Sequence, residues 1–202
     1  MRIIAGQFKS RLIKSPKGVE LRPTADRVKE SLFGILGTLV IGKNVLDLFS
    51  GTGNLGLEAI SRGAGSCIFV DNNPRCTSAI KDNIESLGIE GNVEVILSDA
   101  LNYIKKIGGK EHDFDIIFLD PPYYHSLVKK TLILLDHYNI IKPSTIIVAE
   151  HHKKDDLPEP NELKRLELRR QEEYGGSILS FYLMKRDLDK GGANDTQGSI
   201  SG

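Results

Sequence analysis

The chain has 202 residues, of which 27% are charged. This length fits one sizeable α/β domain with a small appendage and is short for two full domains. The formal net charge of +0 excludes a strongly basic protein that binds any polyanion, and it also excludes an acidic disordered chain.

The first 43 residues differ in charge from the rest of the chain. They carry nine basic and three acidic side chains, so a local net charge of +6 is offset by −6 in the remainder. The loose alternation of "MRIIAGQFKSRLIKSP", punctuated by Gly6 and Pro16, predicts a small basic β-hairpin appendage over residues 1–20. The following "TADRVKESLFGILG" predicts a helix with Thr24 as a candidate N-cap and Val28 and Leu32 on its apolar face.

From Lys43 to Glu150, short β-rich runs alternate with amphipathic helical stretches. Runs such as "NVLDLF", "CIFVD" and "FDIIFLD" are continuously apolar, as strands buried on both faces are. This pattern predicts an α/β, Rossmann-like doubly wound fold with a mostly parallel sheet over residues 21–186. "ELKRLELRRQEEY" is compatible with a charged helix or an edge strand, and "GGSILSFYLMKR" predicts a last strand, which would close a C-terminal antiparallel hairpin. Residues 187–202 lack periodicity and are expected to form a flexible tail.

Several classes of protein are disfavoured by what the sequence contains. Cys67 and Cys76 show no spacing for a metal site or a disulfide framework, so both are expected to be reduced, buried thiols. No apolar run approaches the ~18 residues of a membrane span, and we expect a soluble, cytoplasmic protein. The five histidines form no HExxH or H-x-H pair, so no metal is predicted.

A glycine-rich loop joins the first strand of this pattern to a helix. Gly51, Gly53 and Gly56 have the G-x-G-x-x-G spacing that allows a ligand to approach the backbone at a helix N-terminus. Alone, this spacing is a weak signal, because a plain tight turn also accounts for it. Asp71 ends the next strand, 20 positions after Gly51, where a carboxylate can accept hydrogen bonds from both ribose hydroxyls. The pair predicts a cofactor that contains a nucleoside.

Two further carboxylates help to distinguish NAD from S-adenosylmethionine. Asp47 lies in the first strand, near the loop, where we expect it to meet the ammonium group of an amino-acid ligand; NAD has no such group. Asp99 follows the third strand, where the exocyclic amine of adenine would lie in this fold. A role for Asp99 as the N-cap of the next helix has equal weight.

The segment "FLDPPYYH" ends the fourth strand of this pattern, at the edge of the sheet where ligands bind in doubly wound folds. Pro121 and Pro122 fix φ and lack an N–H of their own. The Asp120 carboxylate and the Pro121 carbonyl can therefore both accept hydrogen bonds from one amino group, while Tyr123 offers a ring face to a planar base. Two acceptors favour the pyramidal amine, whose lone pair can attack a methyl group, and they stabilise the charge that forms on nitrogen.

The pair of motifs "DLFSGTGNLGLEA" and "DPPY" resembles Rossmann-like S-adenosylmethionine-dependent methyltransferases that modify planar amino groups. With "MRIIAGQFKSRLI", "LRPTADRVKESLFGIL" and "YGGSILSFY", the chain is similar over about residues 1–186 to the bacterial small-subunit ribosomal RNA guanine-N2 methyltransferase family. One departure is "YGGS", where relatives are expected to carry an acidic or polar residue after the first glycine.

The resemblance implies a role for individual residues. It implies methylation of guanine N2 in 16S ribosomal RNA, with S-adenosylmethionine as the cofactor and Asp120, Pro121 and Tyr123 in the catalytic motif. It assigns a set of residues to the cofactor, namely Asp47, Phe49, Gly51, Gly53, Asp71 and Asp99. The partner would be ribosomal RNA or an assembling small subunit, and the enzyme is expected to be a monomer.

The resemblance implies that the basic N-terminal segment binds RNA. It would bind RNA phosphates without coating the whole protein in positive charge, although the charge alone, without the motifs, favours an ordinary solvated surface. The expected RNA-binding side chains are Arg2, Lys9, Arg11, Lys14, Arg22 and Arg27.

Three alternative functions stay open at this point. The first is another methyltransferase for planar amines, acting on DNA adenine N6 or protein glutamine, although DNA enzymes usually need a further target-recognition region. The second is an NAD-dependent oxidoreductase, which leaves "DPPY" unexplained. The third is an RNA-binding module with a vestigial cofactor site.

Overall fold

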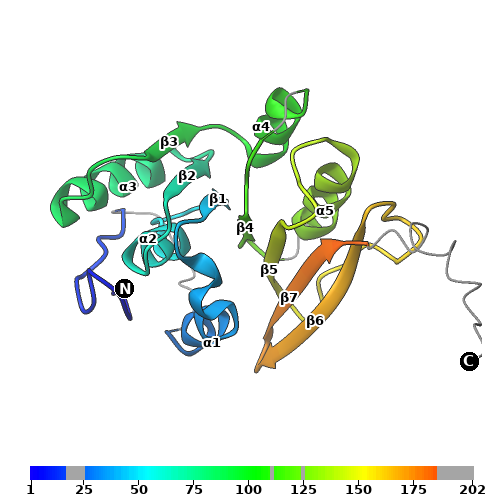
Figure 1. Cartoon of the computed structure of the whole chain (residues 1–202), viewed down its shortest axis with the longest axis horizontal. Coiled ribbons are helices and arrows are strands. Elements are labelled where there is room, and N and C mark those ends of the chain that lie inside the picture. Colours follow the sequence, from blue (N-terminus) through cyan, green and yellow to red (C-terminus); the bar gives the residue numbers. More distant parts are fainter. Residues whose placement is uncertain (17–25, 110–111, 124–125, 186–202) are drawn as a thin grey trace, which may run out of the picture.

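One seven-stranded sheet forms the centre of the molecule (Figure 1). The computed structural model describes residues 1–16, 26–109, 112–123 and 126–185. The predictions made for Arg22, Thr24 and the tail 187–202 lie outside the described residues. The strands are β1 (Asn44–Leu48), β2 (Ser66–Asp71), β3 (Val93–Leu97), β4 (Ile116–Leu119), β5 (Ile146–His152), β6 (Leu166–Tyr174) and β7 (Ser177–Met184).

The strand order is β3-β2-β1-β4-β5-β7-β6. Strands β1 to β5 are parallel, whereas β7 is antiparallel to both β5 and β6. This confirms the predicted doubly wound, mostly parallel sheet with a C-terminal antiparallel hairpin. The strand order reverses between β1 and β4, and in such sheets the crevice outside the carboxyl ends of the strands at this point is where ligands bind.

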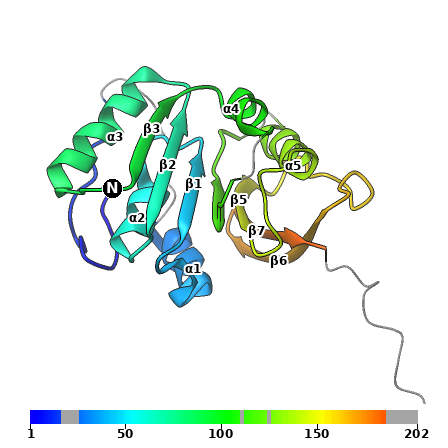
Figure 2. The same ribbon diagram turned by 45° about the horizontal axis from the view of Figure 1, so that its top comes forward.

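Helices cover both faces of the sheet (Figure 2). Alternate residues of one strand belong to different cores: Ile116 and Phe118 pack with α1 to α3, whereas Ile117 and Leu119 pack with α4 and α5. Burial on both faces explains why these strands are continuously apolar in sequence. The helices are α1 (Asp26–Leu36), the 3-10 turn η1 (Gly37–Val40), α2 (Asn54–Ser61), α3 (Pro74–Leu87), α4 (Ala100–Ile107) and α5 (Leu127–His137). In the described part of the chain, none of them is long and apolar enough to span a membrane.

The N-terminal segment, residues 1–16, folds back on itself through a single antiparallel bridge between Arg2 and Leu12. The amide of Ile3 donates to the Arg11 carbonyl at 2.9 Å, and that of Ile13 donates to the Met1 carbonyl at 3.0 Å. Ile3 and Ile13 are buried in the core shared by α1, α2 and α3. The predicted hairpin is therefore reduced to one bridge, and it packs into the core of the main domain.

The charged stretch "ELKRLELRRQEEY", compatible in sequence with a helix or an edge strand, contains the edge strand β6. Its pairing with β7 shifts register between Leu168 and Arg170, a bulge that interrupts the edge. The charged side chains and this bulge are features that protect an edge strand from pairing with another chain. The end of β6 is tied to α1 by a hydrogen bond between the hydroxyls of Tyr174 and Ser31.

Candidate cofactor and substrate site

A cavity of about 900 Å³ opens at the carboxyl ends of β1, β2, β4 and β5. The fold brings together at its wall most of the residues that the sequence assigned to cofactor and catalysis. They are Phe49, Gly51, Asp71, Asp99, Asp120, Pro121 and Tyr123. Of the described residues assigned to these two roles, Asp47 and Gly53 do not line the cavity.

Asp71 organises the glycine loop. Its Oδ2 accepts a hydrogen bond from the Gly51 amide at 2.8 Å, and its Oδ1 accepts one from the Asn73 amide at 2.8 Å. Each carboxylate oxygen has a second lone pair. The side chain can therefore hold the loop and still accept hydrogen bonds from two hydroxyl groups of a ligand.

Phe49 begins the loop with a φ of +62°, a left-handed conformation that costs a residue with a side chain about 1–3 kcal/mol. Such strain is concentrated at functional sites, and here the strained residue lies at the cavity wall. The strain is consistent with a role of Phe49 in holding the occupant of the cavity.

Gly53 differs from the prediction because it lies beneath the loop. Its φ of +78° starts helix α2, and its amide donates to the Ser50 carbonyl at 2.7 Å. A Cβ at Gly53 would come within 3.3 Å of Ile80, Leu57 and Phe69. The positive φ of the turn and the close packing both favour glycine at this position.

Asp47 is the second correction. The sequence placed its carboxylate within reach of a ligand's ammonium group, but the residue is 1% exposed and its Oδ2 accepts the Gly56 amide at 2.9 Å. Burial raises the pKa of Asp47 to about 7, and the negative charge of Asp71 adds to this rise. Asp47 thus anchors the first turn of α2 from below.

Asp99 satisfies the capping role that was left open. Its Oδ1 accepts the Asn102 amide at 2.9 Å, and the residue is the N-cap of α4. It also lines the cavity. The two roles proposed for Asp99 are therefore compatible, because the cap engages one carboxylate oxygen.

The Asp-Pro-Pro-Tyr loop follows β4 at the same edge of the sheet. Pro121 is buried, and Tyr123 is half-buried with its hydroxyl 2.9 Å from Oγ of Ser177 and 3.4 Å from Oε1 of Glu150. The Tyr123 ring lies 5.5 Å from the ring of His152, tilted by 51°. The predicted stacking wall is thus held at its hydroxyl end by β5 and β7.

Several cavity residues were not predicted from the sequence. Cys76 lies beside Asp71, and burial, together with the Asp71 charge, raises the pKa of its thiol to about 11, so it is a neutral packing group. Cys76 and Cys67 are both free and buried, as expected. Glu150, in β5, lines the cavity, and Asn54 lies at the start of α2. The amide Nδ2 of Asn54 is buried and has no hydrogen-bond partner among the described residues.

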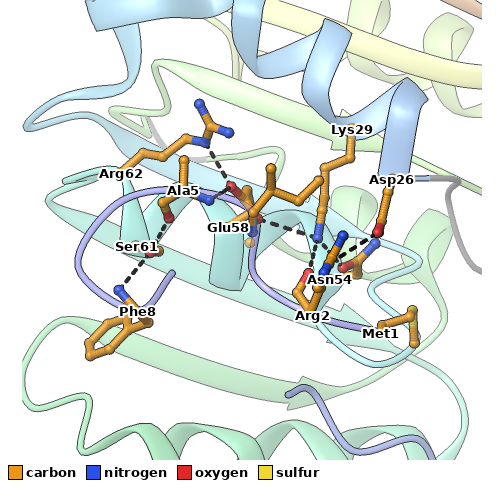
Figure 3. Close-up of polar contacts among 12 residues, drawn as sticks. Met1, Arg2, Ala5, Phe8, Asp26, Lys29, Asn54, Glu58, Ser61 and Arg62 are labelled. Atoms are coloured by element: carbon orange, nitrogen blue, oxygen red, sulfur yellow. Dashed lines mark hydrogen bonds and ion pairs between the residues drawn. The ribbon is translucent and has the colours of Figure 1, made fainter. Parts of the chain in front are cut away.

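A buried ion pair fixes the N-terminal segment beside the cavity (Figure 3). Lys29 and Glu58, whose side chains are 0% exposed, lie 3.3 Å apart. The Lys29 ammonium also donates to the Arg2 carbonyl and to Asn54 Oδ1, each at 2.7 Å. Burial lowers the pKa of Lys29, and the attraction of Glu58 opposes that effect.

Glu58 contacts the segment directly. Its two carboxylate oxygens accept the amides of Ile4 and Ala5, at 2.8 Å and 3.0 Å, and its Oε1 also accepts Nε of Arg62. One turn further along, the Ser61 hydroxyl donates to the Ala5 carbonyl (Figure 3). Met1 lies at the cavity wall, so the first residue of this segment forms part of the site.

The basic side chains expected to bind RNA are exposed wherever the structure describes them. Arg2 forms an ion pair with Asp26 at 3.4 Å, and Arg11 donates to the Ser86 carbonyl at 2.8 Å. A side chain must be exposed to contact an RNA phosphate, and these side chains are. The Asp26 carboxylate and the Ser86 carbonyl, however, already bind the guanidinium groups of Arg2 and Arg11. The described members of the set are Arg2, Lys9, Arg11, Lys14 and Arg27.

The sequence matches a known protein family over most of its length. The family model described as "Conserved hypothetical protein 95" matches residues 1–183. The chain belongs to this family. It is 39% identical over 182 residues to the Bacillus subtilis (strain 168) protein named "Putative rRNA methyltransferase YlbH", covering 90% of this chain and 98% of that protein.

Further members of the family carry more specific names. "Ribosomal RNA small subunit methyltransferase D" of Buchnera aphidicola subsp. Acyrthosiphon pisum (strain APS) is 39% identical over 158 residues, which are 78% of this chain and 81% of the relative. The solved structure titled "Putative methyltransferase yhhF from Escherichia coli" superposes with a TM-score of 0.78 at 30% identity, covering 92% of this chain and 98% of that one. The family resemblance and the Rossmann-like fold expected from the sequence are therefore confirmed.

Proposed function

We propose that this protein is an S-adenosylmethionine-dependent methyltransferase that methylates the exocyclic N2 amine of a guanine in small-subunit ribosomal RNA. The observation that carries the proposal is that one cavity is lined by both the glycine loop with Asp71 and the Asp-Pro-Pro-Tyr loop. The names of the relatives support an rRNA substrate. The substrate would be ribosomal RNA or an assembling small subunit, bound by a monomeric enzyme in the cytoplasm.

The residues of the cavity fit the proposed cofactor. Asp71 retains lone pairs for the two ribose hydroxyls, and Gly51 allows close approach to the backbone. Phe49, Asp99 and Cys76 extend the wall of the same cavity, and we assign them to the adenosine part of the cofactor. Asn54 also lines the cavity, and its buried amide Nδ2 has no acceptor among the described residues. When bound, S-adenosylmethionine supplies a methyl group on a sulfonium.

The chain's own residues would then prepare the amine for methylation. The Asp120 carboxylate and the Pro121 carbonyl accept its two N–H groups and disfavour the planar form in which the lone pair is delocalised into the base. As the nitrogen bonds to the methyl group, the bond from that methyl to the sulfonium sulfur would break and leave a neutral thioether. The same two acceptors would stabilise the positive charge that develops on nitrogen, until its surplus proton passes to the Asp120 carboxylate or to solvent. Tyr123, fixed through Ser177 and Glu150, would stack on the base and align it. Guanine N2 lies in a base-paired edge, so the target must be unpaired or flipped out.

Mapping of modified nucleosides tests this function directly. Mass spectrometry of ribosomal RNA from cells with and without the gene should show one N2-methylguanosine in the small-subunit RNA that disappears on deletion and returns on complementation. Loss of a different methylated nucleoside would reject the guanine-N2 assignment. Calorimetric binding of NADH without binding of S-adenosylmethionine would reject methyl transfer altogether.

A pair of aspartate variants separates catalysis from cofactor binding. Asp120→Ala should abolish methyl transfer while leaving the affinity for S-adenosylhomocysteine nearly unchanged, because this carboxylate is expected to contact the amine. Asp71→Ala should instead weaken S-adenosylhomocysteine binding. Equal losses of cofactor affinity in both variants would contradict the division of roles.

A further inference from the structure

Two carboxylates lie side by side at the edge of the sheet that forms the cavity. Strands β4 and β5 are parallel neighbours, and Leu119 is paired with Ala149 in their register. Continued by one residue, this register places Asp120, directly after the end of β4, beside Glu150 of β5, at the spacing of about 4.8 Å between neighbouring strands. Side chains at paired positions point to the same face, and both residues line the cavity.

Glu150 is a buried carboxylate with a defined setting. It is 4% exposed, and its Oε1 lies 3.4 Å from the Tyr123 hydroxyl, which is also within 2.9 Å of Ser177 Oγ. The stacking ring and this carboxylate are therefore positioned together. A buried carboxylate is stabilised by each donor that faces it, and the cavity is the direction from which a ligand's donor can come.

The chemistry of the bases gives this second carboxylate a use. In guanine, the ring nitrogen N1 beside the N2 amine carries a proton, so the edge presents hydrogen-bond donors at both positions. In adenine and cytosine, the ring nitrogen beside the amine is an unprotonated acceptor. A carboxylate next to the amine site would therefore attract guanine and repel the other two bases.

We propose that Glu150 is a specificity-determining residue that accepts the N1–H of the target guanine while Asp120 and Pro121 hold the N2 amine. This inference rests on the proposed function, because it concerns how the same site chooses its base. It explains how an amine-binding motif that does not itself identify the base can act on guanine. It also assigns Tyr123 a hydroxyl contact that couples base stacking to recognition of the base edge.

The test uses RNA with 2-aminopurine in place of the target guanine. This base keeps the C2 amine but has an unprotonated N1. The wild-type enzyme should prefer guanine by about 10–100-fold in kcat/KM, the range expected for one hydrogen bond to a charged group. Glu150→Gln, whose amide can donate to an unprotonated N1, should reduce that preference at least tenfold. Offering both RNAs together to one preparation makes the ratio independent of the fraction of enzyme that is folded.

Ser177→Ala is the matched control, because it removes another contact of the Tyr123 hydroxyl without changing a carboxylate. It should affect both RNAs alike and leave the preference unchanged. If Glu150→Gln also leaves the preference unchanged, Glu150 only positions Tyr123, and the inference is wrong even though guanine methylation stands. If the wild-type enzyme methylates no guanine, the proposed function itself fails.

Discussion

Replacing the buried carboxylate of Asp47 should remove a loss of stability that the protein suffers as pH rises. Asp47 is 1% exposed and has a pKa raised by burial to about 7, from an ordinary value of 3.8. Its Oδ2 accepts the Gly56 amide, a contact that the amide oxygen of an asparagine can also make. Asp47→Asn therefore removes the charge and keeps the acceptor.

The sign follows from proton binding. Between about pH 4 and pH 7, the folded state holds a proton on Asp47 that the unfolded chain has already released, so the free energy of unfolding falls as pH rises. A shift of about three units, at about 1.4 kcal/mol each, amounts to about 4 kcal/mol at neutral pH. The asparagine side chain of the variant does not titrate. Between pH 5 and pH 8 the variant should therefore gain about 2–3 kcal/mol relative to the wild type.

Urea unfolding followed by circular dichroism measures this difference at pH 5, 6, 7 and 8, without cofactor. The chain has no tryptophan, so fluorescence is less suitable. Asp82→Asn, at an exposed position of α3, is the control and should give a profile parallel to that of the wild type. Parallel profiles for Asp47→Asn as well would show that burial does not perturb this carboxylate, and the anchoring role beneath the loop would have to be abandoned.

Three further predictions concern packing, the ion pair and RNA. Gly56→Ala should destabilise the protein by about 1–3 kcal/mol, because the new Cβ would lie 2.3 Å from Cε1 of Phe69. At Gly34, an added Cβ would meet no atom within 4 Å. Gly34→Ala should therefore stabilise α1 by up to about 1 kcal/mol in the same denaturation assay. Lys29→Met should cost about 3–5 kcal/mol, and amide hydrogen exchange should accelerate in the N-terminal segment; unchanged protection there would contradict the clamp. Replacing four basic side chains by alanine should weaken RNA binding and lower the slope of log K against log salt by up to about 3, whereas an unchanged slope would remove RNA contact from this segment. These four are Arg2, Lys9, Arg11 and Lys14.

The fold was predictable because its strands are local in sequence. Each central strand is a continuous apolar run, and strands alternating with helices have few alternatives to a doubly wound sheet. The carboxyl ends of such strands meet at one edge, which is why Asp71 and Asp120, far apart in the chain, were correctly expected to lie together.

The sequence did not predict which residues of the glycine loop motif are buried and which line the cavity. Asp47 and Gly53 belong to the motif and are buried, but loop residues 49–52 line the cavity and these two do not. Whether a motif residue faces the ligand depends on the path of the loop, which includes the unusual φ of Phe49. A motif match assigns residues to a loop, while the side of the loop on which each lies is a property of the packed structure.

Glu150 and Ser177 were missed for different reasons. Glu150 falls in the strand after the Asp-Pro-Pro-Tyr loop, so the rule that located Asp120 would also have located this carboxylate. Ser177 could not be found that way, because its place depends on the antiparallel register that pairs it with His152. Such pairing between distant segments is specified by tertiary packing and has no local signature.

The buried ion pair of Lys29 and Glu58 is better explained by position than by stability. A pair taken fully out of water gains little over apolar residues of the same size, because desolvation offsets the attraction. Three of its additional hydrogen bonds, however, are specific to one register of the N-terminal segment. The Glu58 carboxylate accepts hydrogen bonds from the amides of Ile4 and Ala5, and the Lys29 ammonium donates one to the carbonyl of Arg2. A slip of one residue would leave these buried groups unpaired, so the pair fixes where the exposed basic side chains lie relative to the cavity.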